Sequence, residues 1–205
     1  MNDAFVLQNV AGLAEVIANV GLFSDPVDVT RDAFVEIDDW FITGGPRQSI
    51  FNPYTGVIAI FCTRLLNNLP PVLYEDGEQT RDFSFVDDIA RANLLAAETD
   101  KMDGLPVNIG SACGTPIREI AANLADILKI NIAPELNGEF RPGEMRNLTS
   151  DTALGQSAGY KPTVDLSEGI SRYIDWSRKQ ADIRDYFSEA SDILKNKGIV
   201  HRAAR

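Results

Sequence analysis

The stretch of residues 80–90 reads T-R-D-F-S-F-V-D-D-I-A and decides the fold class of this chain. Its first seven residues alternate polar and apolar side chains, which predicts a half-buried β-strand. From Asp87 to about Thr99, apolar and small residues recur at helical spacing, and Asp87 or Asp88 is expected to cap the start of that helix. A strand that leads directly into a helix is typical of α/β proteins.

Short apolar segments on both sides of this stretch continue the alternation of strands and helices. Gly and Pro at residues 44–46 predict a break between regular elements. Residues 75–77 are expected to form a turn, and residues 141–146 are expected to form a loop. Thr115 is expected to cap a helix whose first residue is Pro116. The expected strands are 34–37, 71–74, 106–110 and 132–136, and the further expected helices are 3–20, 55–67, 115–128, 166–180 and 182–197.

The composition is that of a globular protein with one sizeable core, since 44% of the 205 residues are hydrophobic and 24% are charged. A net charge of −11 disfavours binding to nucleic acid, which requires clustered Lys and Arg. Cys62 and Cys113 show neither disulfide nor metal spacing. No segment has the pattern of a signal peptide or of a membrane-spanning helix. We therefore expect a cytoplasmic protein with no metal, no membrane association and no nucleic-acid partner.

Three segments carry candidate binding chemistry, and they follow one another in order. The first reads G-P-R-Q at residues 45–48 and continues as N-P-Y-T-G-V at residues 52–57. The second begins with E-D-G at residues 75–77 and includes the stretch at residues 80–90, and the third reads R-P-G-E-M-R at residues 141–146. An arginine at a strand end or in a rigid Pro-Gly loop can project into a cleft, where its planar guanidinium group binds phosphate oxygens in pairs.

Together, these segments resemble the carboxy-terminal half of extended short-chain dehydrogenases of the NAD-dependent epimerase/dehydratase family. The form of the first segment and of the tail at residues 176–200 is most similar to dTDP-L-rhamnose 4-epimerases. The resemblance covers residues 45–176, about two thirds of the chain. It implies the distal part of a Rossmann-like doubly wound sheet with a small α/β substrate-binding lobe, NAD as cofactor, and a dTDP- or UDP-sugar as ligand.

The resemblance also implies roles for individual residues. Arg81 and Arg141 would hold the diphosphate, Glu144 would accept a ribose hydroxyl, and a helix that begins at residues 55–56 would offer free backbone N–H groups to an anion. A plainer alternative is that Arg81 forms a surface ion pair and that the Pro-Gly loop is only a turn. Arg146 could be a third clamp or a solvated residue. The expected substrate-binding set is Thr55, Gly56, Val72, Leu73, Tyr74, Arg81, Phe83, Arg141, Glu144 and Arg146.

The residues that hydride transfer requires in this family are not evident. The sequence contains neither G-x-G-x-x-G nor G-x-x-G-x-x-G, the glycine-rich turns that hold a dinucleotide. None of the five tyrosines is followed four positions later by a lysine, which would lower the pKa of the phenol so that it could act as a base. His201, the only histidine, is expected to lie in a frayed tail. We therefore assign no catalytic residue and leave the cofactor site unknown.

These departures suggest how the chain is organised. Residues 1–40 are expected to be a remnant of the cofactor-binding domain, shortened between about residues 21 and 38. Residues 41–180 would form the sugar-nucleotide-binding part, although Ile42 and Gly44 replace the Asn and Tyr of the family's N-x-Y-G-P pattern. Residues 181–205 would form a carboxy-terminal helix and tail.

Three functions remain open from the sequence. The chain could be a nucleotide-sugar 4-epimerase, by descent an isomerase. It could instead be a non-catalytic sugar-nucleotide-binding fragment that works as a homodimer or with a complementing chain. It could also be an inactive truncated remnant. Because the cofactor loop and the catalytic base are missing, we expect the chain alone to be inactive.

Overall fold

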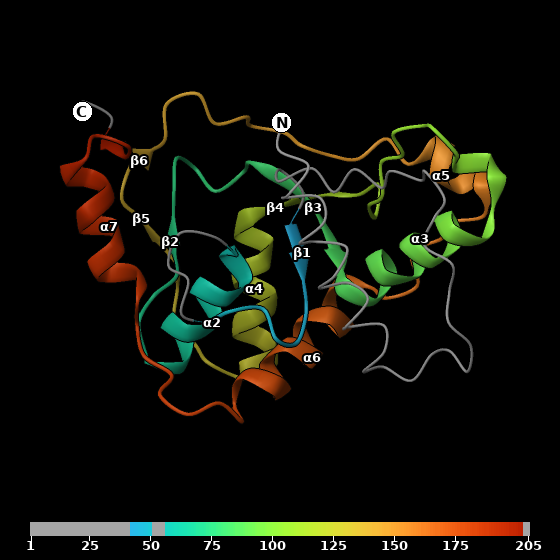
Figure 1. The fold of residues 1–205 in the computed structure, drawn as a ribbon. Coiled ribbons are helices and arrows are strands. Elements are labelled where there is room, and N and C mark those ends of the chain that lie inside the picture. Colours follow the sequence, from blue (N-terminus) through green and yellow to red (C-terminus); the bar gives the residue numbers. More distant parts are fainter. Residues whose placement is uncertain (1–41, 51–55, 203–205) are drawn as a thin grey trace.

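The computed structural model of the chain describes residues 42–50 and 56–202, which form a mixed α/β structure (Figure 1). The expected helix at residues 3–20, the expected strand at residues 34–37 and Thr55 lie outside the described residues. Among the described helices, none combines the length and the apolar character that crossing a membrane would require.

A three-stranded sheet lies at the centre of the described structure. Strand β3 (Thr80–Phe85) pairs in parallel with β1 (Ile42–Gly44) and antiparallel with β4 (Gly114–Pro116). The expected strand at residues 80–86 is confirmed, but the expectation of one polar, solvated face is wrong. All residues from Arg81 to Phe85 are buried, because helices and loops cover both faces of the strand.

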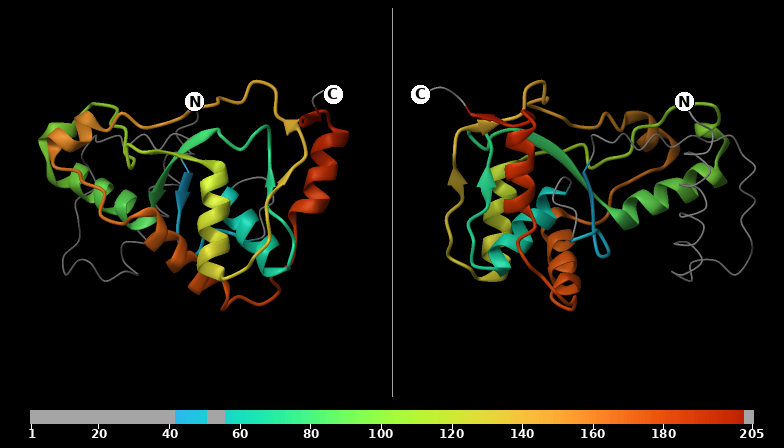
Figure 2. Two further views of the ribbon diagram at one scale, coloured as in Figure 1. Left: turned by 180° about the vertical axis from the view of Figure 1, so that it is seen from behind. Right: turned by 60° about the vertical axis from the view of Figure 1, so that its left-hand side comes forward.

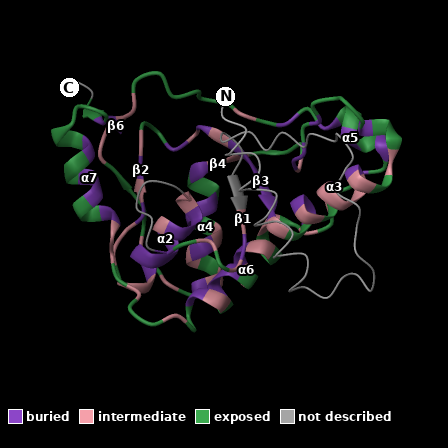
Figure 3. Ribbon diagram, in the orientation of Figure 1, coloured by how far each residue is buried: buried purple, intermediate pink, exposed green. Residues whose placement is uncertain are grey.

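Three helices form the main hydrophobic core beside this sheet. Helix α2 (Val57–Leu66) packs on α4 (Ile117–Leu128), which in turn contacts α6 (Leu166–Ser177). In Figure 3 many of the buried residues gather on these three helices. The expected helices at residues 55–67, 115–128 and 166–180 are therefore present, with shorter bounds. The most deeply buried members of this core include Cys62, Leu65, Ile120, Leu124, Ile170, Tyr173 and Ile174.

Short strand pairs border this core on one side. Strand β2 (Val72–Leu73) pairs in parallel with β5 (Glu135–Leu136), within the expected strands at residues 71–74 and 132–136. Strand β6 (Glu139–Phe140) pairs with β7 (His201–Arg202), which follows α7 (Phe187–Asn196). The expectation that His201 lies in a frayed tail is therefore wrong, because its backbone pairs with Phe140 and its ring lies 5.8 Å from the Phe140 ring.

A second, smaller hydrophobic cluster lies at the opposite end of the molecule from α7 (Figures 1 and 2). It is formed by α3 (Val86–Glu98), the 3-10 helix η1 (Asp100–Met102), α5 (Ala153–Ala158) and the segment at residues 106–110. That segment was expected to be a strand, but it pairs with no strand of the described structure. Its alternating apolar residues, Val107 and Ile109, are buried by packing in this cluster instead.

Two helix starts differ from the prediction. Helix α3 begins at Val86, so neither Asp87 nor Asp88 is its N-cap. The carboxylate of Asp88 accepts hydrogen bonds from other parts of the chain, whereas that of Asp87 pairs with Arg172. Helix α4 begins at Ile117 rather than at the expected Pro116, because residues 114–116 are held in β4 by pairing with β3.

Candidate functional site

A pocket with a volume of about 170 Å³ lies between the main core and the elements that border it. Helices α2, α4 and α7, strands β2 and β3, and the loop after β6 all contribute to its wall. This volume is below the range of about 300–1,000 Å³ that is usual for sites enclosing a whole drug-sized ligand. The pocket therefore suits one portion of a larger molecule. Its lining residues are Gly56, Val57, Ile60, Phe61, Val72, Tyr74, Gln79, Arg81, Ile117, Arg141, Glu144 and Phe187.

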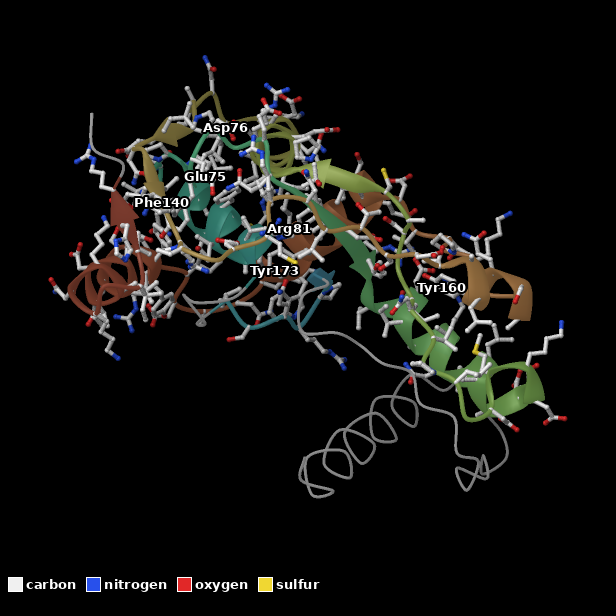
Figure 4. All side chains as sticks on the ribbon, turned by 90° about the horizontal axis from the view of Figure 1, so that it is seen from above. Glu75, Asp76, Arg81, Phe140, Tyr160 and Tyr173 are labelled. Atoms are coloured by element: carbon white, nitrogen blue, oxygen red, sulfur yellow. The ribbon has the colours of Figure 1, made fainter. Side chains whose placement is uncertain are left out.

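Arg81 is a buried charge in the wall of this pocket, with only 7% of its surface exposed. Its guanidinium group donates to Glu144 Oε1 at 2.9 Å and to the backbone oxygens of Thr80 at 2.8 Å and of Arg146 at 3.2 Å. It is therefore not the surface ion pair that the sequence left open. In Figure 4, Arg81 lies between Glu75 and Tyr160.

Arg141 brings a second positive charge to the same pocket. Its guanidinium carbon lies 5.5 Å from the centroid of the Tyr74 ring, a cation–π geometry. Among the described residues, no acidic side chain forms an ion pair with Arg141. Burial raises the pKa of the Tyr74 phenol, and the positive charge of Arg141 partly opposes that effect. Among the described lining residues, one acidic side chain, that of Glu144, faces the two arginines, so this part of the wall has an excess of positive charge in a chain of net charge −11.

Three buried polar atoms on lining residues have no hydrogen-bond partner of normal geometry among the described residues. They are Gln79 Oε1, Arg141 Nε and the hydroxyl oxygen of Tyr74. An unsatisfied buried polar group costs about 1–3 kcal/mol, and native structures contain few of them.

The rest of the pocket wall is apolar, and part of it comes from the carboxy-terminal helix. Phe187 of α7 faces the pocket together with Ile60 and Ile117. Buried Arg64 holds this helix in place, because it donates to Asp185 at 3.1 Å and lies 5.3 Å from the Phe187 ring. The segment expected to be a carboxy-terminal helix and tail thus contributes a wall to the pocket.

The amino-terminal end of α2 also reaches this pocket. Gly56 is the N-cap of the helix and has a φ of 84°, a conformation that favours glycine. A Cβ at this position would lie 2.5 Å from Gln48 Nε2, the end of a flexible side chain that can shift, so the positive φ is the reason for glycine here. The free N–H groups of this helix end are suited to a negatively charged group.

The structure brings six of the ten expected binding residues to one pocket. Leu73 is instead part of the hydrophobic core, and Thr55 lies outside the described residues. Arg146 is exposed and pairs with Glu75 at 3.0 Å and with Asp76 at 2.7 Å. Phe83 lines a different hollow. The six residues that line the pocket are Gly56, Val72, Tyr74, Arg81, Arg141 and Glu144.

Sequence reasoning did not single out Gln79, Ile60, Ile117 or Phe187, all of which line the pocket. The signal for Gln79 was its position two residues before Arg81, on the same face of an extended segment. The apolar residues had no separate signal, because their spacing is also that of ordinary core residues.

The hollow that Phe83 lines lies between β1, β3 and the start of α6 and has a volume of only about 20 Å³. It has room for about one water molecule. Two of its lining residues, Ser84 and Tyr173, have buried hydroxyl groups without a partner among the described residues. Burial raises the pKa of the Tyr173 phenol. This hollow is therefore a packing gap rather than a substrate site.

Comparisons with known proteins agree with this fold. Residues 42–110 match the NAD dependent epimerase/dehydratase family. The dTDP-L-rhamnose 4-epimerase of Burkholderia thailandensis is 34% identical over 140 residues, which cover 67% of this chain and 38% of that protein. The chain belongs to this family over the residues that match.

Solved structures of nucleotide-sugar epimerases have the same fold over the matched part. The UDP-N-acetylglucosamine 4-epimerase of Methanobrevibacter ruminantium M1, in complex with UDP-N-acetylmuramic acid, has 33% identity and a TM-score of 0.64, covering 69% of this chain and 45% of that one. The UDP-glucuronic acid 4-epimerase of Bacillus cereus, in complex with UDP-glucuronic acid and NAD, has 29% identity and a TM-score of 0.60. The match covers 68% of this chain and 43% of that one. The chain thus has a partial Rossmann-like fold and spans less than half the length of these family members.

Proposed function

We propose that the pocket binds the nucleoside diphosphate part of a nucleotide sugar. The observation that carries this proposal is that Arg81 and Arg141 line one pocket, where Glu144 is the one acidic side chain among the described lining residues. A diphosphate carries negative charge that guanidinium groups hold through paired hydrogen bonds. The apolar residues of α2, α4 and α7 offer a surface for a planar base. Glu144, which stays one-third exposed, is placed to accept a ribose hydroxyl.

The nucleotide is proposed to be a UDP or dTDP derivative, because family members that act on UDP-sugars and on dTDP-L-rhamnose both match this chain. dTDP-L-rhamnose is the finer candidate, from the form of the residues at 45–57. For the whole protein, we extend this proposal from binding of the nucleotide sugar to its epimerisation.

The remnant of the cofactor-binding domain expected at residues 1–40 lies outside the described residues, and the described junction of β3 and α3 is not suited to NAD as an alternative site. Strand β3 leads into α3 without a glycine-rich turn, and Asp87 and Asp88 occupy the first turn of that helix. Two carboxylates at a helix start repel a pyrophosphate. We therefore propose binding without turnover for the described part of the chain. Catalysis would require NAD held by residues outside the described part, with a homodimer partner or a complementing chain as one possible source.

Thermal unfolding in the presence of separate ligands tests the proposal. UDP, dTDP, UDP-glucose and dTDP-L-rhamnose are each titrated into the purified chain, with NAD in a parallel series. A ligand that binds only the folded state at a hundredfold excess over Kd adds about 2.7 kcal/mol of stability. We expect a rise in Tm with at least one of the nucleotides and none with NAD. No rise with any nucleotide would refute the binding function, and a rise with NAD would refute binding without a cofactor.

A further inference from the structure

The turn between β5 and β6 contains Asn137 and Gly138, and Asn137 is the only asparagine of the chain that is followed by glycine. Gly138 has a φ of 70°, and a Cβ at this position would meet no atom within 4 Å. Among the described residues, no group accepts a hydrogen bond from the Gly138 N–H. The nitrogen of Gly138 is therefore open to its surroundings, because glycine has no side chain to shield it.

The side chain of Asn137 lies over this same peptide. Its Oδ1 accepts from the backbone N–H of Glu139 at 3.0 Å, which is the hydrogen bond of an Asx turn. Because that bond spans Gly138, it brings Asn137 Cγ toward the Gly138 nitrogen. The Glu139 N–H also points at the oxygen on which negative charge develops when a nucleophile attacks Cγ. A donor in that place stabilises the transition state of the attack.

We propose that Asn137 is a site of spontaneous deamidation, a reaction of one of the thermolabile residue types. The Gly138 nitrogen loses its proton to solvent and forms a bond to Asn137 Cγ, and the bond from Cγ to the side-chain nitrogen breaks. That nitrogen takes up a proton and leaves as ammonia, so the product is a cyclic imide, a succinimide. Water then opens the ring at either carbonyl and gives aspartate or isoaspartate. Water is the only co-reactant.

Both products alter the surroundings of the carboxy-terminal segment. Each adds a negative charge near Glu139, whose buried side chain pairs with Lys195 of α7 at 2.7 Å. Isoaspartate also adds a methylene group to the main chain between β5 and β6. Strand β6 pairs with β7, and Arg202 of β7 donates to the backbone oxygen of Asn137 at 3.1 Å. The deamidated chain is therefore expected to hold β7 and α7 less firmly.

The turn at Asp76 and Gly77 is a matched control within the same chain. Asp76 Oδ1 accepts from the backbone N–H of Glu78 at 3.0 Å, and Gly77 has a φ of 74°, so the local geometry is the same. A hydrogen bond from Arg146 lowers the pKa of the Asp76 carboxyl group, which is therefore a carboxylate near neutral pH. The negative charge of a carboxylate repels a nucleophile. Isoaspartate should accordingly form at residue 137 much faster than at residue 76.

Incubation of the purified chain in mildly alkaline buffer, followed by peptide mass spectrometry, tests the proposal. Replacement of the side-chain NH2 by OH raises the mass by about 1 Da, and fragmentation locates the change. Enzymatic methylation of isoaspartate detects the isomerised product. We expect Asn137 to gain this mass about tenfold or more faster than Asn147, which is exposed but precedes Leu148.

Asn137→Gln is the variant that should resist the reaction, because the longer side chain would have to close a larger ring. Incubation should lower the Tm of the wild-type chain and leave that of Asn137→Gln unchanged. Equal rates at Asn137 and Asn147, or equally fast isoaspartate formation at Asp76, would overturn the proposal, and the wild-type chain alone gives this answer. If deamidation of Asn137 left the Tm unchanged, the link to the carboxy-terminal segment would be overturned.

Discussion

Asp82 and Asp88 are buried even more deeply than the pocket residue Gln79, at 1% and 2% exposed against 8%, but their hydrogen bonding differs. Asp82 accepts from the backbone N–H groups of Ser111, Ala112 and Ser150, at 2.8, 3.0 and 3.1 Å. Asp88 accepts from those of Thr163 and Val164, at 2.9 and 3.2 Å. The pocket wall, in contrast, leaves Gln79 Oε1 and Arg141 Nε without partners.

Buried polar groups therefore differ between the two regions in whether they are satisfied within the protein. The two aspartates connect β3 and α3 to distant loops, and all their bonds are internal to the protein. They therefore stabilise the region around α3 and α5. The polar atoms of the pocket residues have no partner among the described residues and therefore reduce the stability of the ligand-free protein. Variants in the two regions should consequently change different measured quantities.

Removal of the Asp82 carboxylate should have the largest effect on stability. Asp82→Ala leaves three backbone N–H groups without their acceptor, one of them in the buried residue Ser150, so the free energy of unfolding should fall by about 2 kcal/mol or more. Urea denaturation measures the change, with Asp103→Ala, at an exposed position, as control. Equal stabilities for the two variants would contradict the structural role of Asp82.

Alkaline pH should weaken the same region through Tyr160, whose hydroxyl donates to the backbone oxygen of Gly110 at 2.9 Å. Burial, with smaller contributions from the charges of Asp88 and Asp82, raises the pKa of Tyr160 from 10 to about 12. Below pH 10 the Tyr160 phenol keeps its proton in both the folded and the unfolded state. Between pH 10 and 12 only the unfolded state releases it, so stability should fall as pH rises.

The Tyr160 effect should approach about 2–3 kcal/mol at pH 12, because each pKa unit corresponds to about 1.36 kcal/mol. Urea denaturation between pH 8 and pH 12 measures it. Tyr160→Phe removes the ionisable group, so this variant should show a smaller loss over the same pH range. If its pH dependence matched that of the wild type, another group would be responsible.

Arg141→Gln should change ligand affinity with little change in stability. The side chain has no ion pair with a described residue, so its loss breaks no internal salt bridge. Loss of a charged hydrogen-bond donor should weaken UDP or dTDP binding by roughly tenfold to a hundredfold. Calorimetric titration measures this, and Arg118→Gln, which breaks an exposed pair with Glu78, is the control. A loss of stability without a loss of affinity would place Arg141 with the structural residues.

Tyr173→Phe should have the smallest effect. The Tyr173 hydroxyl is buried and has no partner among the described residues, so its removal takes away an unsatisfied group. We expect the free energy of unfolding to stay the same or to rise by up to about 1 kcal/mol. Thermal unfolding checks the direction. A clear loss of stability would show that a water molecule in the adjacent hollow satisfies this hydroxyl.

The parts of the fold predicted from sequence are those with a strong local pattern. The strand at residues 80–85 and the helix that follows it were predicted because apolar periodicity and turn residues act within a few positions. The segment at residues 106–110 was predicted as a strand for the same reason. This prediction failed because an alternating pattern of apolar residues indicates only which side chains are buried. Packing against helices can bury those side chains as well as pairing in a sheet can.

The candidate site shows the same division. Arg81, Arg141 and Glu144 were selected from short motifs, and the structure places all three at one pocket. Arg146 belongs to the same motif, but it pairs with Glu75 and Asp76 at the surface. Residues in one loop share a sequence signal, and only the course of the loop determines which side chains turn inward.

The sequence by itself determined the α/β class, the family and the arginines available for an anionic ligand, because these depend on local periodicity and short motifs. Only the tertiary structure decided that Phe187 lines the pocket, that Gln79 Oε1 is buried without a partner among the described residues, and that Asp82 and Asp88 are satisfied elsewhere. Hydrogen-bond satisfaction depends on groups far apart in the chain. No local sequence pattern indicates whether a buried polar atom will find a hydrogen-bond partner. The unsatisfied polar groups around the pocket can therefore be identified only in the folded structure.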